Sequence, residues 1–440
     1  MPLRLLPLIA ALVVLLVMPV GARAADYVPN QVIVKYAKGV GGGVAADVAA
    51  DAGAAQVAEL PGGSEQLEIQ DGESVHATLD ELRDDPNVDY AVPNWKAHAA
   101  AVPPNDPGWP LQWNFSGPFG INLVDAWTEA AALGAPGGRG AVVAVLDSGV
   151  AYERRGRYRR APDLRHRTFV HPWDFIQRDA HPDDQYGHGT HVAGTIAQTT
   201  NNGVGTAGIA YNAKIMPLRV LDSRGEGDSA AIARAIRYAV RHRADVINLS
   251  LEFPAEVRSA EIPDVVSALH LAHRRGVVVV AAAGNQTDLA VAYPARVKTV
   301  IAVGATTDDG CQADYSNGGR DLDISAPGGG VDAPNSDTEW DVAHCDPDAP
   351  GRPIVQQTFT SSIRRFGLPR IYEGTSMASP HVAAVAALLI ATKRLGPHPT
   401  PKQVEDRLKE TARPAGPADR YGAGLVDAAA ALAPAPVTTP

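Results

Sequence analysis

The chain has 440 residues, of which 45 % are apolar and 20 % are charged, a balance that excludes a chain disordered throughout. Its formal net charge of -10 disfavours a nucleic-acid partner, and we expect none. Two cysteines are too few for a disulfide-stapled scaffold or an all-cysteine zinc site. The length predicts two or three domains.

The N-terminus has the pattern of a secretory signal peptide. Arg4 precedes an uncharged, apolar stretch over residues 5–20, and small residues at positions 22 and 24 form a cleavage site. The alternative is a membrane anchor, but the stretch is short for a span of about 30 Å. We therefore expect residues 1–24 to be removed. The mature protein is then secreted, extracellular or periplasmic, with no membrane anchor.

Residues 26–98 predict a small α+β unit. Apolar periodicity indicates strands at residues 31–36, 66–70 and 88–92 and helices at residues 44–55 and 74–83. Ser74 is the expected cap of the second helix. The order suits a ferredoxin-like fold if a further strand lies near Ala58.

The rest of the chain predicts one large domain. Residues 99–112, rich in Pro, Ala and Asn, indicate a processing linker. Across residues 113–432, continuous Val/Ile/Ala strands alternate with helices, which predicts an α/β fold with a mainly parallel sheet covered on both faces. The expected strands span residues 141–146, 214–220, 245–251, 276–283 and 297–303, and helices span residues 227–243 and 264–275. Residues 433–440 predict a disordered tail.

Three segments of the large domain carry residues suited to nucleophilic catalysis. Asp147 ends a predicted buried strand, where ligand sites of parallel sheets lie. His188 lies among glycines at the start of an expected helix. Ser376 opens a long apolar helix, where backbone N–H groups and the helix dipole can stabilise an oxyanion.

Each of these residues also has a simpler interpretation. Asp147 could close a turn, and Ser376 could be only an N-cap. His188 and His191 could form a metal pair, but no third ligand at a recognised zinc spacing lies nearby. The Ser376 segment is not the nucleophile elbow of α/β-hydrolases, which disfavours a lipase or esterase of that type.

The chain order Asp, His, Ser is one of the known triad orders. With GHGTHVAG at residues 187–194 and GTSMASPH at residues 374–381, the chain resembles the subtilisin-like serine proteases of the S8 family over residues 105–432. The resemblance implies a subtilisin-like three-layer fold with a mainly parallel central sheet. The small N-terminal unit resembles an inhibitor-I9-like propeptide.

The resemblance implies a secreted serine endopeptidase that is made as a zymogen. Ser376 would attack the peptide carbonyl, His188 would accept its proton, and Asp147 would orient the imidazole. Asn285 would hold the oxyanion; losing such a donor costs on the order of 10²–10³ in kcat, a figure measured in subtilisin itself. The propeptide would act as an intramolecular inhibitor until self-cleavage between residues 98 and 105. We expect a monomer.

An extended protein or peptide substrate would lie between two edge segments. By resemblance, these substrate-binding residues are Ser250, Leu251, Glu252, Gly225, Glu226 and Gly227, with Tyr293 beside the primary pocket. Glu252 departs from the Ser-Leu-Gly that is usual in the family. It either narrows the pocket or favours a basic P1 side chain, or else it turns to solvent.

Residues 201–205 resemble the family's calcium loop, and calcium prefers oxygen ligands. The implied ligands are Asp106, Asp163, Asn202, Thr199, Val204 and Thr206. The alternative is an ordinary Asn-Gly turn.

Export separately makes a Cys311–Cys345 disulfide possible, worth about 2–4 kcal/mol, the alternative being two unpaired thiols.

Two segments depart from the family pattern. Residues 151–160 are Arg-rich and form a solvated loop, a contact for an acidic partner or an autolysis site. Residues 329–371 match no motif and either shape the cleft or are simply tolerated.

Two rival functions are a non-catalytic binding protein and an ester hydrolase. The complete set of active-site residues disfavours the first, and the substrate edges and propeptide disfavour the second.

Overall fold

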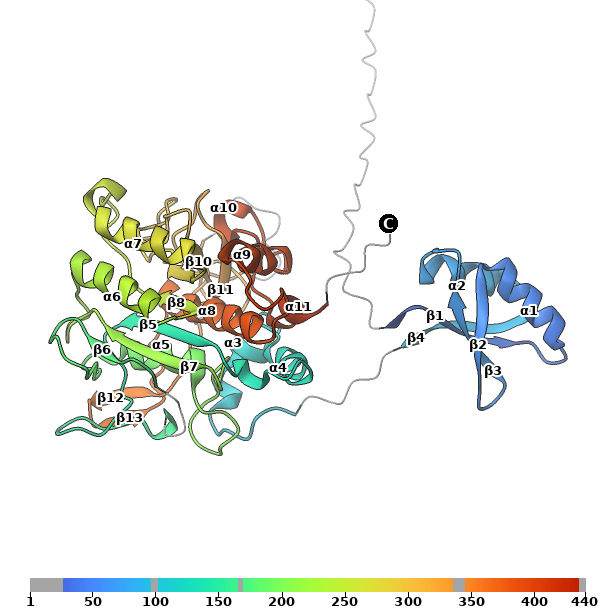
Figure 1. The fold of residues 1–440 in the computed structure, drawn as a ribbon, viewed down its shortest axis with the longest axis horizontal. Coiled ribbons are helices and arrows are strands. Elements are labelled where there is room, and N and C mark those ends of the chain that lie inside the picture. The colour runs from blue at the N-terminus through green and yellow to red at the C-terminus, as the bar shows by residue number, and fades with distance from the viewer. Residues whose placement is uncertain (1–26, 96–101, 165–168, 335–344, 435–440) are drawn as a thin grey trace, which may run out of the picture. The chain divides into compact units, whose positions relative to one another are not determined.

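A computed structural model describes residues 27–95, 102–164, 169–334 and 345–434. The chain divides into two units between Ala100 and Ala101 (Figure 1). The predicted signal peptide, residues 1–24, lies outside the described residues, and so do residues 435–440 of the predicted tail. Within the described part of the chain, no helix has the length and apolar character needed to cross a bilayer.

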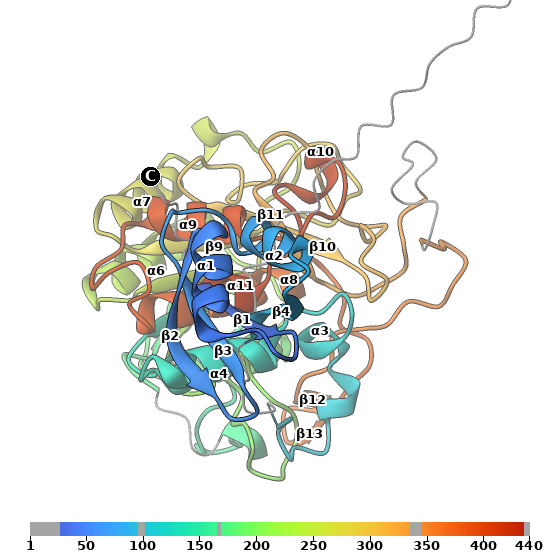
Figure 2. The same ribbon diagram turned by 90° about the vertical axis from the view of Figure 1, so that its right-hand side faces the viewer.

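The N-terminal unit contains β1 (Tyr27–Tyr36), α1 (Gly42–Asp51), β2 (Ala54–Leu60), β3 (Ser64–Ile69), α2 (Val75–Asp84) and β4 (Val88–Trp95). Its antiparallel sheet has the order β2-β3-β1-β4, which is the ferredoxin-like arrangement expected from the sequence. Val32 and Val34 of β1 point into one core with Leu79 and Leu82 of α2. Both helices lie on the same side of the sheet (Figure 2).

Two sequence expectations for this unit concern the segment after α1. The further strand expected near Ala58 is β2. The predicted helix 44–55 was wrong in its last residues, because the helix ends at Asp51. Gly53 has a φ of +62°, a left-handed conformation that ends the helix and turns the chain into β2.

The larger unit is built on a seven-stranded sheet whose strands, in spatial order, are β11-β10-β9-β8-β5-β7-β6. The strands are β5 (Val142–Asp147), β6 (Trp173–Asp174), β7 (Lys214–Arg219), β8 (Val246–Leu249), β9 (Val278–Ala282), β10 (Ile301–Thr306) and β11 (Ile324–Pro327). All neighbouring pairs are parallel. The carboxyl ends of the strands therefore meet at one edge.

Helices cover both faces of this sheet, which confirms the predicted three-layer α/β fold. Val143 and Val145 of β5 face a core shared with α4 (Leu123–Ala132), α5 (His188–Ala197), α8 (Thr375–Ala391) and α11 (Ala428–Leu432). Ala144 and Leu146 face a second core with α6 (Ser229–Arg241) and α7 (Pro263–Arg274). The remaining helices are α3 (Trp113–Ser116), α9 (Pro401–Glu410) and α10 (Ala418–Tyr421).

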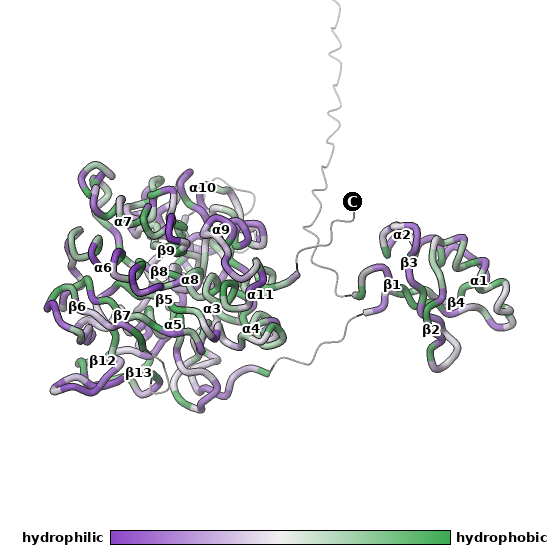
Figure 3. Tube along the Cα trace, viewed as in Figure 1, coloured by the Kyte–Doolittle hydropathy of each residue, from purple (hydrophilic) through white to green (hydrophobic). Residues whose placement is uncertain are grey.

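Helix α8 lies inside the larger unit and is buried along nearly its whole length. It packs against α5 and against strands β8, β9 and β10. Figure 3 contrasts this hydrophobic helix with the hydrophilic hairpin of β12 (Thr358–Ser362) and β13 (Arg365–Gly367). A helix that is apolar on all sides is expected in the core of a large domain, and here it carries Ser376 near its start.

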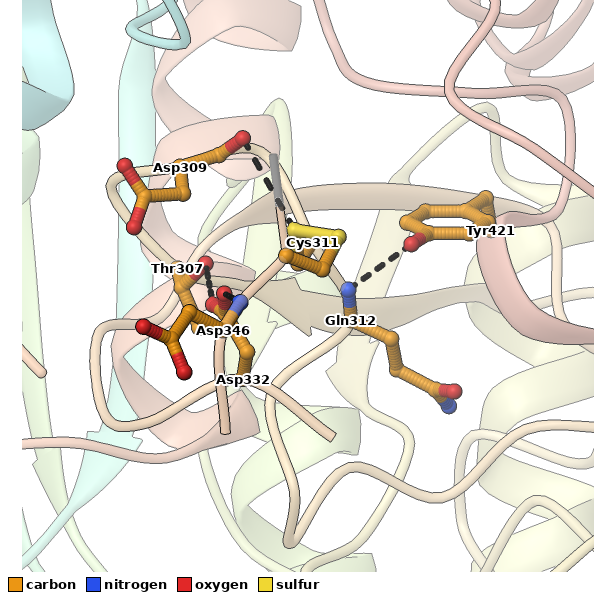
Figure 4. Close-up of a disulfide and its surroundings, with 8 residues drawn as sticks. Thr307, Asp309, Cys311, Gln312, Asp332, Asp346 and Tyr421 are labelled. Atoms are coloured by element: carbon orange, nitrogen blue, oxygen red, sulfur yellow. Dashed lines mark hydrogen bonds between the residues drawn. A yellow bond between two sulfur atoms is a disulfide. The ribbon is translucent and has the colours of Figure 1, made fainter. Parts of the chain in front are cut away.

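The two cysteines are joined in a disulfide, with 5.8 Å between the Cα atoms of Cys311 and Cys345 (Figure 4). Beside it, Thr307 Oγ1 donates to Asp332 Oδ1 at 2.6 Å, and the Asp346 N–H donates to Asp332 Oδ2 at 2.7 Å. The cross-link and the shared carboxylate tie the turn after β10 to two later segments. Such a link stabilises mainly by restricting the unfolded chain.

The C-terminal part of the predicted processing linker, residues 99–112, belongs to the larger unit. Asp106 and Gln112 are buried. The Gln112 amide donates to the Ala207 carbonyl at 2.9 Å and accepts from the Ala207 N–H at 2.8 Å. Any segment that can be cut without disturbing the larger unit therefore lies before Asp106.

Candidate active site

The Asp147 carboxylate and the His188 imidazole form a hydrogen-bonded pair. Asp147 is the last residue of β5 and is fully buried, and His188 is the first residue of α5. His188 Nδ1 lies 2.8 Å from Asp147 Oδ1 and 3.0 Å from Oδ2. The side chain of His188 is 16 % exposed, so one side of the ring remains open to a ligand.

Opposing effects act on the pKa of His188. Burial lowers the pKa, but the charge of Asp147 and its hydrogen bond raise it, and the charge of Asp184 adds to them. The net result is a pKa above the usual 6.5. The imidazole is therefore a stronger base than a free histidine, and its cation is stabilised once it has taken a proton.

A second buried carboxylate, which the sequence analysis missed, holds the start of α5. Asp184 Oδ1 accepts from Ser148 Oγ at 2.9 Å and from the Gly187 N–H at 2.8 Å. Asp184 Oδ2 accepts from the Thr190 N–H at 3.0 Å and from Thr190 Oγ1 at 2.6 Å. An aspartate four residues before His188 was the available signal, because aspartates favour helix N-termini.

Ser376 is the second residue of α8 and contacts the segment that follows β8. Ser376 Oγ donates to the Ser250 carbonyl at 3.3 Å, and Ser250 Oγ donates to the Ser376 carbonyl at 2.8 Å. Strand β8 lies next to β5 in the sheet, so Ser250 and Asp147 occupy the same edge. Helix α5, which carries His188, packs against α8. The fold thus gathers all three predicted triad residues at the carboxyl edge.

Asn285 lies at the same edge, in the turn that follows β9. Asn285 Oδ1 accepts from the Thr375 N–H at 2.8 Å and from Thr375 Oγ1 at 3.0 Å. Thr375 Oγ1 in turn accepts from the Gly284 N–H at 3.2 Å. These bonds fix the amide oxygen of Asn285 toward the first turn of α8, beside Ser376.

The first predicted substrate edge is partly buried. Ser250 and Leu251 are buried, and Glu252 is half-buried. Glu252 does not turn to solvent, because its Oε2 accepts from the Asn285 N–H at 3.0 Å and its Oε1 accepts from Gln286 Nε2 at 2.7 Å. Phe253 follows Glu252, and its N–H donates to the Tyr293 carbonyl at 2.8 Å, which places Tyr293 beside this edge.

The second predicted edge follows β7 and lies near His188. Gly225 is half-buried, and Glu226 and Gly227 are exposed. A Cβ atom on Gly225 would lie 3.0 Å from the ring of Tyr186, whose centroid is 6.5 Å from that of His188. The second edge is therefore more exposed than the first and lies near His188 through Tyr186.

The other histidine of the same motif has a structural environment. His191 is fully buried and stacks on Tyr372, with 4.3 Å between ring centroids. Its Nε2 lies 3.0 Å from the Ile354 carbonyl. Burial lowers the pKa of His191 to about 3, so this ring stays neutral. The metal-pair interpretation of the two histidines has no support in this arrangement.

The predicted calcium residues bring two buried carboxylates together. Asp106 accepts from the N–H groups of Asn201 and Asn202 at 2.7 and 2.9 Å. Asp163 accepts from the Thr206 N–H at 3.0 Å and from Asn202 Nδ2 at 2.8 Å. In the part of the chain that the structure describes, neither carboxylate has a Lys or Arg partner. Burial, with a contribution from the charge of Asp106, raises the pKa of Asp163 to about 7.

The remaining predicted calcium residues line the same loop. Thr199 is buried, and its N–H donates to the Asp163 carbonyl at 3.2 Å. Asn202 Oδ1 accepts from the Val204 N–H at 2.8 Å, so this amide turns its nitrogen, not its oxygen, toward Asp163. A cation there would need the Asn202 amide to turn over.

The Arg-rich loop, residues 151–160, is held by contacts with two other segments. Arg155 Nη2 donates to the buried Asp183 at 2.8 Å. Arg364, from the β12–β13 hairpin, donates to the Arg157 carbonyl at 3.1 Å. The two segments that depart from the family pattern therefore touch each other.

Comparisons with known proteins identify the family. A model of the subtilase family, peptidase S8, matches residues 138–424, and a model of the fervidolysin N-terminal prodomain matches residues 19–94. The chain is 34 % identical over 384 residues to subtilisin E of Bacillus subtilis, covering 84 % of this chain and 83 % of that protein. It is also 34 % identical over 368 residues to a thermophilic serine proteinase of Bacillus sp. strain AK1, covering 84 % and 79 % of the two proteins.

A solved structure points the same way. The protease from Pseudoalteromonas arctica matches with a TM-score of 0.62 and 34 % identity, over 75 % of this chain and 99 % of that protein. The expected S8 resemblance and the expected prodomain are confirmed, with the fervidolysin type as the prodomain that matches. The chain belongs to the subtilase family and is a subtilisin-like serine endopeptidase with an N-terminal prodomain.

Proposed function

We propose that the protein is a secreted zymogen that hydrolyses peptide bonds through an acyl-enzyme on Ser376. The observation that carries this proposal is the Asp147–His188 hydrogen bond at the edge where α8 presents Ser376. His188 Nε2 takes the proton of Ser376 Oγ as that oxygen attacks the carbonyl carbon. His188 then gives the proton to the leaving amine, and water hydrolyses the ester by the same path in reverse.

Asp147 supports both protonation states of His188. Its two oxygens face Nδ1, which keeps a proton on that nitrogen and leaves Nε2 free to accept one. Its charge is fully buried, so water screens it little when the imidazolium forms. The same attraction between Asp147 and the imidazolium raises the pKa of His188.

Asn285 Nδ2 and the Ser376 N–H would hold the oxyanion. Thr375 fixes Oδ1 of Asn285, so the amide nitrogen, which has one N–H for Glu252 and one for a ligand, would be the donor to the oxyanion. The Ser376 N–H is in the first turn of α8, where N–H groups lack intrahelical acceptors. Two preorganised donors at one point are the arrangement that stabilises a tetrahedral intermediate.

An extended substrate would pair with residues 250–252 and 225–227. Within the described part of the chain, the backbone groups of Leu251 and Glu252 make no backbone hydrogen bonds. A peptide strand could satisfy them, with main-chain bonds giving affinity and pockets giving specificity. Tyr293 would line the primary pocket.

Covalent labelling tests the nucleophile directly. A fluorophosphonate probe, which reacts with activated serines, is expected to label one site, mapped by peptide mass spectrometry to Ser376. Ser376→Ala should abolish labelling and lower kcat on the order of 10⁶-fold, the size seen in subtilisin. Ser361→Ala, at an exposed serine, is the matched control and should change neither. Full labelling of the Ser376→Ala protein would contradict the assignment.

We infer the zymogen organisation from the prodomain match. Residues 1–24 would direct export, and residues 26–98 would fold as the inhibitory unit. Self-cleavage between residues 98 and 105 would then release the larger unit, whose folded part already includes Asp106.

The calcium residues fit a cation in charge and in donor type. Asp106, Asp163 and Asn202 would hold it through side chains, and Thr199, Val204 and Thr206 through carbonyl oxygens. Two buried carboxylates that have no Lys or Arg partner among the described residues are costly, and a bound calcium ion would supply the charge that offsets them. Its role would be to stabilise the fold and not to take part in the reaction.

A further inference from the structure

The turn that carries Asn285 is held from two opposite sides. On one side, Thr375 donates twice to Asn285 Oδ1, at 2.8 and 3.0 Å. On the other side, Glu252 Oε2 accepts from the Asn285 N–H at 3.0 Å. The sequence alone could not show this second contact, because Glu252 follows β8 and Asn285 follows β9.

The second oxygen of Glu252 extends the contact into a chain of side chains. Glu252 Oε1 accepts from Gln286 Nε2 at 2.7 Å, and Gln286 Oε1 accepts from Asn317 Nδ2 at 2.7 Å. Buried Asn317 also accepts from the Gln286 N–H at 2.9 Å. The carboxylate also packs closely on the turn, since a Cβ atom on Gly284 would lie 2.7 Å from Glu252 Oε2.

The charge state of Glu252 is coupled to this turn. Burial raises the pKa of the Glu252 carboxyl, and hydrogen bonds from the Asn285 N–H, from Gln286 and from the Asn285 side chain oppose that rise. A carboxylate accepts hydrogen bonds and cannot donate them. The Glu252 carboxylate therefore favours the amide orientation in which the nitrogen of Asn285 faces Glu252. Thr375 favours the same orientation, because it donates to the amide oxygen.

We propose that Glu252 is a positioning residue that orients Asn285 for the oxyanion and is not a receptor for a basic P1 side chain. The inference rests on the proposed role of Asn285. Both carboxylate oxygens are already bonded to the turn, so a P1 cation would have to share the carboxylate with Asn285 and Gln286. With Glu252 in place, the main chain and the amide of Asn285 are fixed before substrate binds, which is what an oxyanion donor requires.

Steady-state kinetics of Glu252→Gln in the full chain test this proposal. Glutamine offers one acceptor oxygen to two donors, so at least one of the bonds to Asn285 and Gln286 is lost. We expect kcat to fall about tenfold per active site, with KM within about twofold and the preference among P1 residues unchanged. Glu256→Gln makes the same chemical change at an exposed residue of the same loop and should leave kcat unchanged. Active sites are counted by fluorophosphonate labelling.

A double-mutant cycle with Asn285→Ala separates this role from a general effect on the fold. If Glu252 acts through Asn285, adding Glu252→Gln to Asn285→Ala should lower kcat less than twofold further. An unchanged kcat in Glu252→Gln, or an equal loss in both backgrounds, overturns the proposal. A raised KM and weaker cleavage after Lys and Arg at unchanged kcat also overturn it, in favour of a P1 role. An Asn285→Ala protein with normal kcat would instead show that the oxyanion assignment itself is wrong.

Gln286→Ala provides a second variant in case the Glu252→Gln protein shows no active sites in the fluorophosphonate labelling. Gln286 is exposed, and its loss frees only one oxygen of Glu252. We expect kcat to fall two- to fivefold at unchanged KM. A kcat equal to that of the wild type would overturn the proposal.

Discussion

The two units of this chain are built on sheets that are buried to different extents. The N-terminal unit has one antiparallel sheet with helices on one side and a single small core. The larger unit has a parallel sheet between two large cores, each covered by helices. In the first, the central strand β1 pairs with β3 and β4, so the first and last strands of the unit lie side by side. In the second, Ser376 meets Ser250, and Asp147 meets His188, across long stretches of chain.

This difference shows where precise chemistry can be placed. A strand buried on both faces has a fixed end, so polar residues that follow it take fixed positions. Asp147 ends β5 and Ser250 and Asn285 follow β8 and β9, and each is held by hydrogen bonds.

The largest effect expected from breaking this arrangement is on the reaction. Asp147→Asn should lower kcat about 10⁴-fold, the order found for serine-protease triads, because the amide stabilises the wrong tautomer. The acid limb of kcat/KM reports the pKa of the free imidazole. Its midpoint should lie above 6.5 in the wild type and move to lower pH in the variant, because burial, which lowers the pKa of His188, is then less opposed.

The control for this experiment is Asp264→Asn, at an exposed residue of α7. It should alter neither kcat nor the midpoint. An acid limb that stays in place in the Asp147→Asn protein would mean that a group other than His188 controls it.

A smaller effect should be confined to the N-terminal unit. Leu79→Ala removes a side chain that is 2 % exposed and packs in the hydrophobic core of this unit, which should cost about 2–5 kcal/mol. Hydrogen exchange on the Ser376→Ala full chain should show more than tenfold faster exchange in β1 and α2, with β9 and β10 unchanged. Val44→Ala, at a residue 46 % exposed, is the control. Equal acceleration in both units would show that they do not unfold independently.

Calcium removal should give the smallest effect, in the larger unit alone. Asp163 binds a proton more tightly in the folded protein (pKa about 7) than in the unfolded chain (3.8). Between those values the native state holds more protons, so the chelated protein loses stability as pH rises. We therefore expect a chelator to lower Tm more at pH 8 than at pH 5. Calcium at 100 times its Kd should restore about 2.7 kcal/mol.

Asp163→Asn should remove both the calcium effect and this pH dependence, whereas Asp348→Asn, at an exposed residue, should keep both. If a chelator did not change Tm at pH 8, the calcium proposal would be wrong and residues 201–205 would form an ordinary turn.

Much of this structure could be predicted from local sequence. Buried strands ending in polar residues located Asp147, and the glycine-flanked histidine and the start of α8 located His188 and Ser376. The ferredoxin-like unit followed from its periodicity, except where Gly53 ended α1 early. Contacts between distant segments could not be predicted. The contact of Glu252 with Asn285 depends on β8 and β9 being neighbours, and no local pattern encodes that order, whereas Asp184, four residues before His188, had a local signal that was missed.

The most direct test of the account is self-processing by Ser376. The chain from residue 25 onward would be expressed as the wild type and as Ser376→Ala, and both would be analysed by intact mass and N-terminal sequencing. We predict that the wild type loses its prodomain by a cut between residues 98 and 105, while the Ser376→Ala chain stays whole. An identical cut in both proteins, or an intact wild type, would contradict the claim that Ser376 performs the cleavage.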